Sequence, residues 1–92
     1  MQNNHFRLQN SLFDNTVTID VFDPERAWTT AGRIEQTPEG LLRFAPAGRL
    51  QHFANRLPKF APAILGIDAF AEKIAGALLS IFSKLDAQMN IF

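Results

Sequence analysis

The sequence contains no cysteine and only two histidines. Without a thiol, the chain has no disulfide bond, no thiol nucleophile and no thiolate ligand for a metal ion. His5 and His52 are far apart, and neither has a second ligand at the helical or turn spacing of a metal site. We therefore expect no metal site and no cofactor, and the missing cysteine fits a reducing compartment.

Motifs of catalysis are missing as well. The chain has no G-x-S-x-G elbow and neither of the glycine-rich patterns that hold phosphates. Acidic pairs such as Asp20 with Asp23 flank predicted turns, where solvated carboxylates are the normal expectation. We therefore expect that the protein is not an enzyme.

Long apolar runs are also missing. The longest nearly uncharged run, Ile74 to Phe82, is far shorter than the about 20 residues that a membrane-spanning helix needs. The first ten residues show no basic region followed by an apolar stretch, which a secretory signal would require. These features predict a cytoplasmic protein that does not contact a membrane.

Phenylalanine, in contrast, is abundant: nine occur among 92 residues, and 47% of the residues are hydrophobic. A chain of this length forms one domain, here 1–92, with a core of modest size. We expect a β-rich half over 1–46 and a helical half over 47–92. Because a small core cannot hide nine large rings, some phenylalanines are expected at an interface.

Two hairpins are predicted in the first half. Alternating residues on both sides of Asp14-Asn15 predict a two-residue turn, with Phe13 opposite Thr16 and Leu12 opposite Val17. The second hairpin turns at residues 37–40 and places Ile34 nearly opposite Phe44. In its first strand we expect one face to carry Trp28, Thr30 and Ile34.

Two helices are predicted in the second half. Apolar residues recur with a helical period at Leu50, Phe53, Ala54 and Leu57, and Pro58 ends this short helix. A longer helix follows from an N-cap at Asp68. Its apolar stripe consists of Phe70, Ile74, Ala77, Leu78, Ile81, Phe82, Leu85 and Met89. The predicted fold is α+β: a small antiparallel sheet of about four strands, packed against a short helix and a long C-terminal amphipathic helix.

Charge is balanced overall but uneven along the chain. Nine basic residues match nine acidic ones, yet the segment from Leu41 to Ile67 has four basic residues and no acidic residue. A local positive field therefore arises without net charge. The candidate binding residues in this segment are Arg43, Arg49, His52, Arg56 and Lys59.

These residues have two interpretations. On an α-helix, Arg49, His52 and Arg56 lie on one side, where guanidinium groups bind phosphate or carboxylate. The alternative is the ordinary solvated face of an amphipathic helix, with Phe53 in the core and acids such as Glu35 approaching in space. The sequence leaves both open.

The long helix also has two interpretations. Its apolar stripe suits packing against the sheet, but the apolar arc is wide. Leu79, Phe82, Ile91 and Phe92 are therefore candidates for a homodimer interface.

A small domain without cysteine or catalytic motifs is typical of a non-catalytic binding protein that inhibits a larger protein or nucleoprotein through its basic surface. Immunity proteins, antitoxins and phage inhibitors of host defence such as anti-CRISPRs belong to this class. The alternatives are a nucleic-acid-binding domain that uses the same residues and a structural dimerisation subunit.

Overall fold

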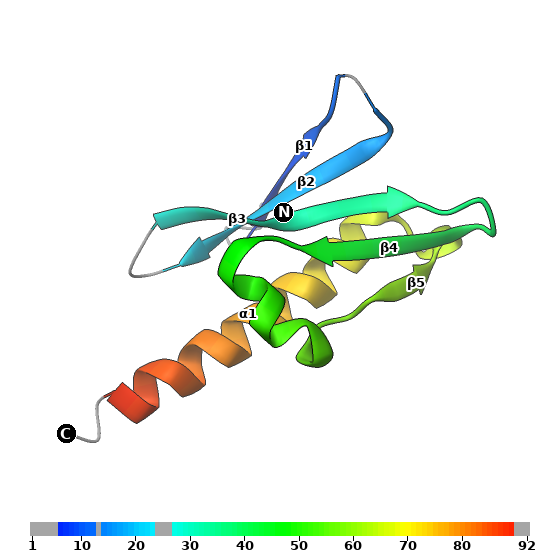
Figure 1. Cartoon of the computed structure of the whole chain (residues 1–92). Coiled ribbons are helices and arrows are strands. Elements are labelled where there is room, and N and C mark those ends of the chain that lie inside the picture. The colour runs from blue at the N-terminus through cyan, green and yellow to red at the C-terminus, as the bar shows by residue number, and fades with distance from the viewer. Residues whose placement is uncertain (1–5, 13, 24–26, 90–92) are drawn as a thin grey trace.

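The computed structural model describes residues 6–12, 14–23 and 27–89. It shows an α+β fold, in which one antiparallel sheet packs against a long helix (Figure 1). The strands are β1 (Phe6–Asn10), β2 (Thr16–Asp23), β3 (Ala27–Gln36), β4 (Leu41–Pro46) and β5 (Phe60–Pro62), and they are ordered β1-β2-β3-β4-β5. The helical elements are η1 (Gly48–Arg56), η2 (Ala63–Leu65) and α1 (Ile67–Met89).

The α+β prediction is confirmed, with one strand more than the four expected. The additional strand, β5, has three residues and pairs antiparallel with β4 from Leu41 to Arg43. A three-residue strand that ends in proline has too little alternation to be recognised from its own residues.

The register of the first hairpin differs from the predicted one by two residues. Leu8 pairs with Ile19 and Asn10 with Val17, so Leu12 lies in the loop with 92% of its surface exposed. The predicted partner Phe13 lies outside the described residues. Since the side chains of a strand alternate with a period of two, this even shift leaves every residue of β1 on its predicted face.

Asp14 explains the longer loop. Its Oδ1 accepts hydrogen bonds from the backbone N–H of Thr16 (3.1 Å) and from the Thr16 hydroxyl (2.5 Å). The backbone N–H of Ser11 donates to the Thr16 carbonyl, which closes the loop over 11–16. The Thr16 hydroxyl, followed by the Ser11 side chain, holds the pKa of Asp14 below its usual value. The side chain of Asp14 thus accepts hydrogen bonds that stabilise this longer loop, which replaces the predicted two-residue turn.

A β-bulge in β3 places Trp28 and Thr30 on the opposite face from Ile34, so the predicted common face of these three residues is wrong. Ile19 pairs with Gly32 but Asp20 pairs with Thr30, which leaves Ala31 as the extra residue. Beyond a bulge the alternation of side chains is displaced by one position. Ile34 therefore lies in the core, whereas Trp28 lies on the outer face of the sheet, where it is 38% exposed.

The outer face carries a small polar and aromatic cluster. Asp20 is only 6% exposed, and its Oδ2 accepts a hydrogen bond from Arg7 Nε at 3.1 Å. The Arg7 guanidinium also lies over the Trp28 ring, 4.6 Å from its centroid. Phe22 meets Trp28 edge-on, with 5.7 Å between ring centroids. Arg7 thus contacts both the Asp20 carboxylate on β2 and the Trp28 ring on β3.

Replacing Arg7 by alanine is expected to lower the free energy of unfolding by about 1–2 kcal/mol, because the buried Asp20 loses its charged hydrogen-bond donor. Oδ1 of Asp20 already has no hydrogen-bond partner among the described residues. No second hydrogen bond there can therefore compensate for the loss of Arg7. Urea unfolding measures the effect. Gln9→Ala, an exposed position on the same strand, is the control and changes stability by less than about 0.5 kcal/mol. Equal stability of the two variants would contradict this role of Arg7.

The second hairpin is confirmed. Ile34 pairs directly with Phe44, and the backbone N–H of Gly40 donates to the Thr37 carbonyl at 3.1 Å. Gly40 has a φ of 86°, which glycine adopts without a steric penalty. β3 and β4 consequently form a continuous pair that extends to Pro46, directly before η1.

The predicted short helix is present, but it is a 3₁₀ helix. Leu50 and Leu57 are buried, and Phe53 packs against the core from a partly buried position. Backbone bonds three residues apart bound the element, from Leu50 N–H to the Ala47 carbonyl and from Leu57 N–H to the Ala54 carbonyl. The apolar residues were therefore predicted correctly, and the pitch of the helix was not.

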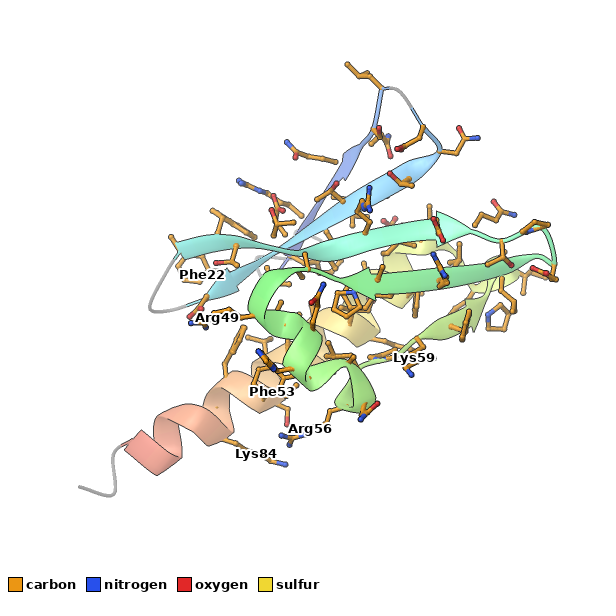
Figure 2. The ribbon with its side chains drawn as sticks, viewed as in Figure 1. Phe22, Arg49, Phe53, Arg56, Lys59 and Lys84 are labelled. Carbon is orange, nitrogen blue, oxygen red and sulfur yellow. The ribbon has the colours of Figure 1, made fainter. Side chains whose placement is uncertain are left out.

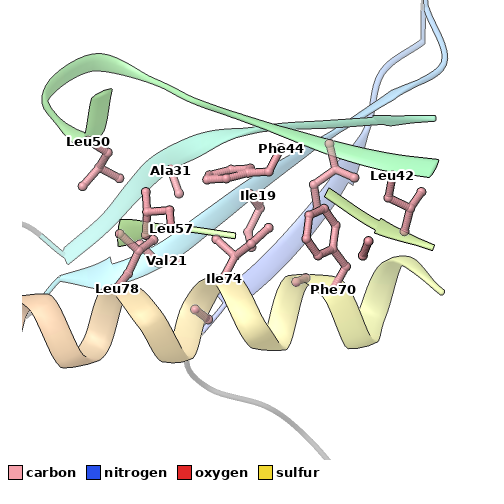
Figure 3. Packing of buried hydrophobic residues seen from close by; sticks show 14 of the residues in the cluster. Ile19, Val21, Ala31, Leu42, Phe44, Leu50, Leu57, Phe70, Ile74 and Leu78 are labelled. Carbon is pink, nitrogen blue, oxygen red and sulfur yellow. The ribbon is translucent and has the colours of Figure 1, made fainter. Parts of the chain in front are cut away.

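α1 supplies the other side of the core (Figure 3). It begins at Ile67, so Asp68 lies in its first turn and the Gly66 carbonyl accepts the first backbone bond, from Phe70. Phe70, Ile74 and Leu78 are fully buried against Ile19 and Ile34 of the sheet. Both halves of the chain thus contribute to one core. In the described part of the chain, no helix is long and apolar enough to cross a membrane.

Candidate binding surface

The geometry of η1 decides which of its basic residues share a side. A 3₁₀ helix has three residues per turn, so residues three apart lie above one another. Arg49 and His52 therefore align, but Arg56 falls in line with Leu50 and Phe53. The predicted α-helical alignment of Arg49, His52 and Arg56 is wrong for this reason. Arg56 instead extends away from the sheet, to the same side as Lys84 of α1 (Figure 2).

All five candidate residues are exposed. Arg49, His52, Arg56 and Lys59 form no ion pair with an acid of the described residues, and we call these four the basic surface. Figure 2 shows its labelled members spread over η1 and the segment that follows. Because exposed arginine and lysine side chains keep most of their hydration, their positive charge remains available to a partner.

Arg43 is different, because its guanidinium forms an ion pair with Glu35. The two residues are direct neighbours across the β3–β4 pairing. The Arg43 side chain is 50% exposed and that of Glu35 is 38% exposed, so water screens the pair and its net contribution is small. The neutralising acid comes from the first half of the chain, as one of the two interpretations of the sequence expected.

Arg49 also has an acid in its surroundings. It lines a hollow of about 110 Å³ together with Asp23 and Phe82. Asp23 is buried at the end of β2, so its charge lies below the surface on which Arg49 is exposed. The hollow at the end of η1, which Lys59 lines, has no acidic residue in its lining.

A larger hollow of about 340 Å³ opens beside the end of η1, and we call it the β4 hollow. Its lining is mainly apolar and includes Phe44, Ala54, Leu57 and Phe60. Arg43 and Lys59 are the charged residues that line it, and no acidic residue does. An apolar cavity with two cations at its edge suits a ligand that has both an apolar group and a negative charge.

The shortness of β5 explains why this hollow exists. β5 pairs with β4 only as far as Arg43 opposite Phe60, and one further bond joins Phe44 N–H to the Lys59 carbonyl. Beyond this point the chain leaves β4 at Pro58, a residue without an N–H donor. Ala45 and Pro46 therefore have η1 beside them instead of a strand, and the space between is the hollow.

The candidate dimer residues have mixed positions. Phe82 packs against the core in a partly buried position, and Leu79 is half-buried on α1. Ile91 and Phe92 lie outside the described residues. The contact of Phe82 with the chain's own core accounts for its place in the apolar arc, so a homodimer stays a prediction.

In the part of the chain that the structure describes, no three potential ligand residues are grouped so that they could hold a metal ion. Comparison with models of known families, with curated proteins and with solved structures finds no match to this chain. The function is therefore inferred from the surface of the protein itself.

The sequence pattern did not identify Lys84 or the apolar lining of the β4 hollow. Lys84 is exposed on α1, and Figure 2 draws it on the same side of the molecule as Arg56. Phe60, which belongs to this lining, is 56% exposed. Its neighbours across the sheet follow from the β4–β5 pairing, which the sequence pattern did not predict.

Proposed function

We propose that this chain is a non-catalytic binding protein that attaches to an acidic surface of a larger protein or nucleoprotein through its basic surface. One observation carries the proposal: the exposed cations Arg49, Arg56 and Lys59 have no carboxylate partner among the described residues, while Arg7 and Arg43 have one each. A partner's acids would supply the counter-charges, which favours rapid and specific association. Covering an acidic groove would inhibit the larger partner, as phage inhibitors of host defence do.

A protein partner fits this surface better than a nucleic acid does. The β4 hollow and the exposed Phe60 lie next to Lys59, and an apolar side chain of a protein can fill such a space. Phe53 is partly buried against the core, so its ring offers no open face on which a base could stack.

The proposal is tested by charge reversal. The triple variant Arg49→Glu, Arg56→Glu and Lys59→Glu is expected to keep its thermal melt and to lose the partner that the wild-type chain captures from its native lysate. The melt is retained because exposed substitutions of this kind change stability little. Affinity purification followed by mass spectrometry measures the loss.

A matched pair of double variants controls for net charge. Arg56→Glu with Lys59→Glu and Arg33→Glu with Lys73→Glu change the charge equally, but Arg33 and Lys73 lie outside the basic surface. Capture should fail for the first pair and persist for the second. If both pairs behave alike, the basic surface is not the binding site. Retardation of single- or double-stranded nucleic acid at low salt would instead favour the nucleic-acid alternative.

A further inference from the structure

We propose that the β4 hollow receives one large apolar side chain from an acidic segment of the partner protein, while Arg43 and Lys59 bind the flanking carboxylates. The inference rests on the proposed function, because it specifies the kind of segment that this side of the protein recognises. It adds an apolar anchor to a surface otherwise defined by charge.

The size of the hollow sets the size of the anchor. A volume of about 340 Å³ is at the lower end of the range of ligand pockets, which begins near 300 Å³. The space suits a single phenylalanine, leucine or methionine side chain better than a cofactor. Binding energy at protein interfaces is concentrated in such buried anchors.

The lining of the hollow is preformed. Phe44 is 3% exposed and Leu57 is 6% exposed, and both belong to the hydrophobic core. Core side chains are held in place by close packing, so the hollow does not have to be ordered when a ligand enters. Phe60, which is 56% exposed, adds an aromatic wall that a bound side chain would cover.

The charges beside the hollow determine what flanks the anchor. Lys59 is exposed and has no ion pair with a described acid, and Arg43 shares only a solvated pair with Glu35. A guanidinium has five N–H donors, so Arg43 can bind a second carboxylate while it keeps the first. Because no acid lines the hollow, a segment with acidic residues on both sides of the anchor is complementary to it.

The test uses blocked pentapeptides and amide chemical shifts of the full chain. The first peptide has a central phenylalanine with two acidic residues on each side. The second has serine at the centre, and the third keeps the phenylalanine between lysines. A short single-stranded oligonucleotide is the fourth probe. The amides to follow are those of Arg43, Leu57, Lys59 and Phe60, which line the hollow.

We expect the acidic phenylalanine peptide to shift these amides saturably. Serine at the centre should weaken binding by at least about tenfold, since a missing apolar group in a pocket costs about that factor or more. The lysine peptide should not saturate. Ala54→Leu adds three carbon atoms to the lining, which narrows the hollow without removing a cation, and should weaken the first peptide by at least about tenfold. Asn55→Leu, at an exposed neighbouring position outside the lining, is its control.

Several outcomes would overturn the inference. They are the absence of saturable shifts with the first peptide, equal binding of the phenylalanine and serine peptides, and saturation of these amides by the oligonucleotide alone. If Ala54→Leu does not fold, Phe60→Ser replaces it at an exposed position and should give the same loss. Capture of the lysate partner separates the two proposals: loss on charge reversal but retention in Ala54→Leu refutes the anchor and keeps the proposed function.

Discussion

Gly32→Ala is expected to lower the free energy of unfolding by about 3 kcal/mol, at the upper end of the usual cost of overpacking. A Cβ atom at this position would lie 2.1 Å from the Ala45 carbonyl oxygen and 2.8 Å from Cε1 of Phe44. Neither neighbour can move freely. Ala45 belongs to the β3–β4 pairing, and the Phe44 ring is only 3% exposed within the core.

The damage from Gly32→Ala should also reach the binding surface. Relief of the clash requires β3 and β4 to separate near Pro46, which is the partner of Gly32 across the sheet. β4 supplies Arg43, Phe44 and Ala45 to the lining of the β4 hollow. We therefore expect this variant to lose peptide binding together with stability, which urea unfolding and peptide titration would measure on the same sample.

Gly76→Ala is the matched control for Gly32→Ala. Gly76 is exposed in the middle of α1, and no atom lies within 4 Å of the position that its Cβ would take. Alanine in a helix interior is more favourable than glycine by roughly 0.5–1 kcal/mol, so this variant should be more stable than the wild type. The same substitution thus has opposite signs at the two sites. A loss of equal size at both would show that the contact at Gly32 is not the cause.

Phe70→Ala is expected to lower the free energy of unfolding by about 4 kcal/mol, within the range for large core residues. Phe70 is fully buried near the start of α1, and it is among the largest side chains of the core. Its removal costs the transfer free energy of the ring and leaves a cavity that a 92-residue domain has few neighbouring side chains to fill. A loss of this size is a large part of the stability of a small domain.

Ile64→Ala provides the comparison for Phe70→Ala. Ile64 is 97% exposed in η2, so its truncation should change the free energy of unfolding by less than about 0.5 kcal/mol. Urea titrations of the two variants and the wild type measure both values. Similar stabilities for Phe70→Ala and Ile64→Ala would mean that α1 does not pack on the sheet through Phe70.

Local patterns were sufficient for most of the fold. The apolar period of α1 identified Phe70, Ile74 and Leu78, and all three are buried. Alternation and turn residues placed Ile34 opposite Phe44, which the structure confirms. These signals succeed because burial on one side of a helix or strand requires a fixed spacing of apolar residues.

Local patterns failed where the spacing itself changed. The bulge at Ala31 added one residue to β3 and moved Trp28 to the outer face. The side chain of Asp14 lengthened the first loop and displaced the register by two residues. Neither feature produces a periodic pattern of apolar residues, because each changes the chain at only one or two positions.

The amino-acid order alone identified the candidate cations, since no acid occurs between Leu41 and Ile67. It did not reveal which of them are neutralised or which share a side. Strand pairing brought Glu35 to Arg43, the 3₁₀ pitch turned Arg56 away from Arg49, and the short β5 opened the β4 hollow. Composition is a property of each segment by itself, whereas ion pairs and cavities arise only when segments distant in the chain are packed together.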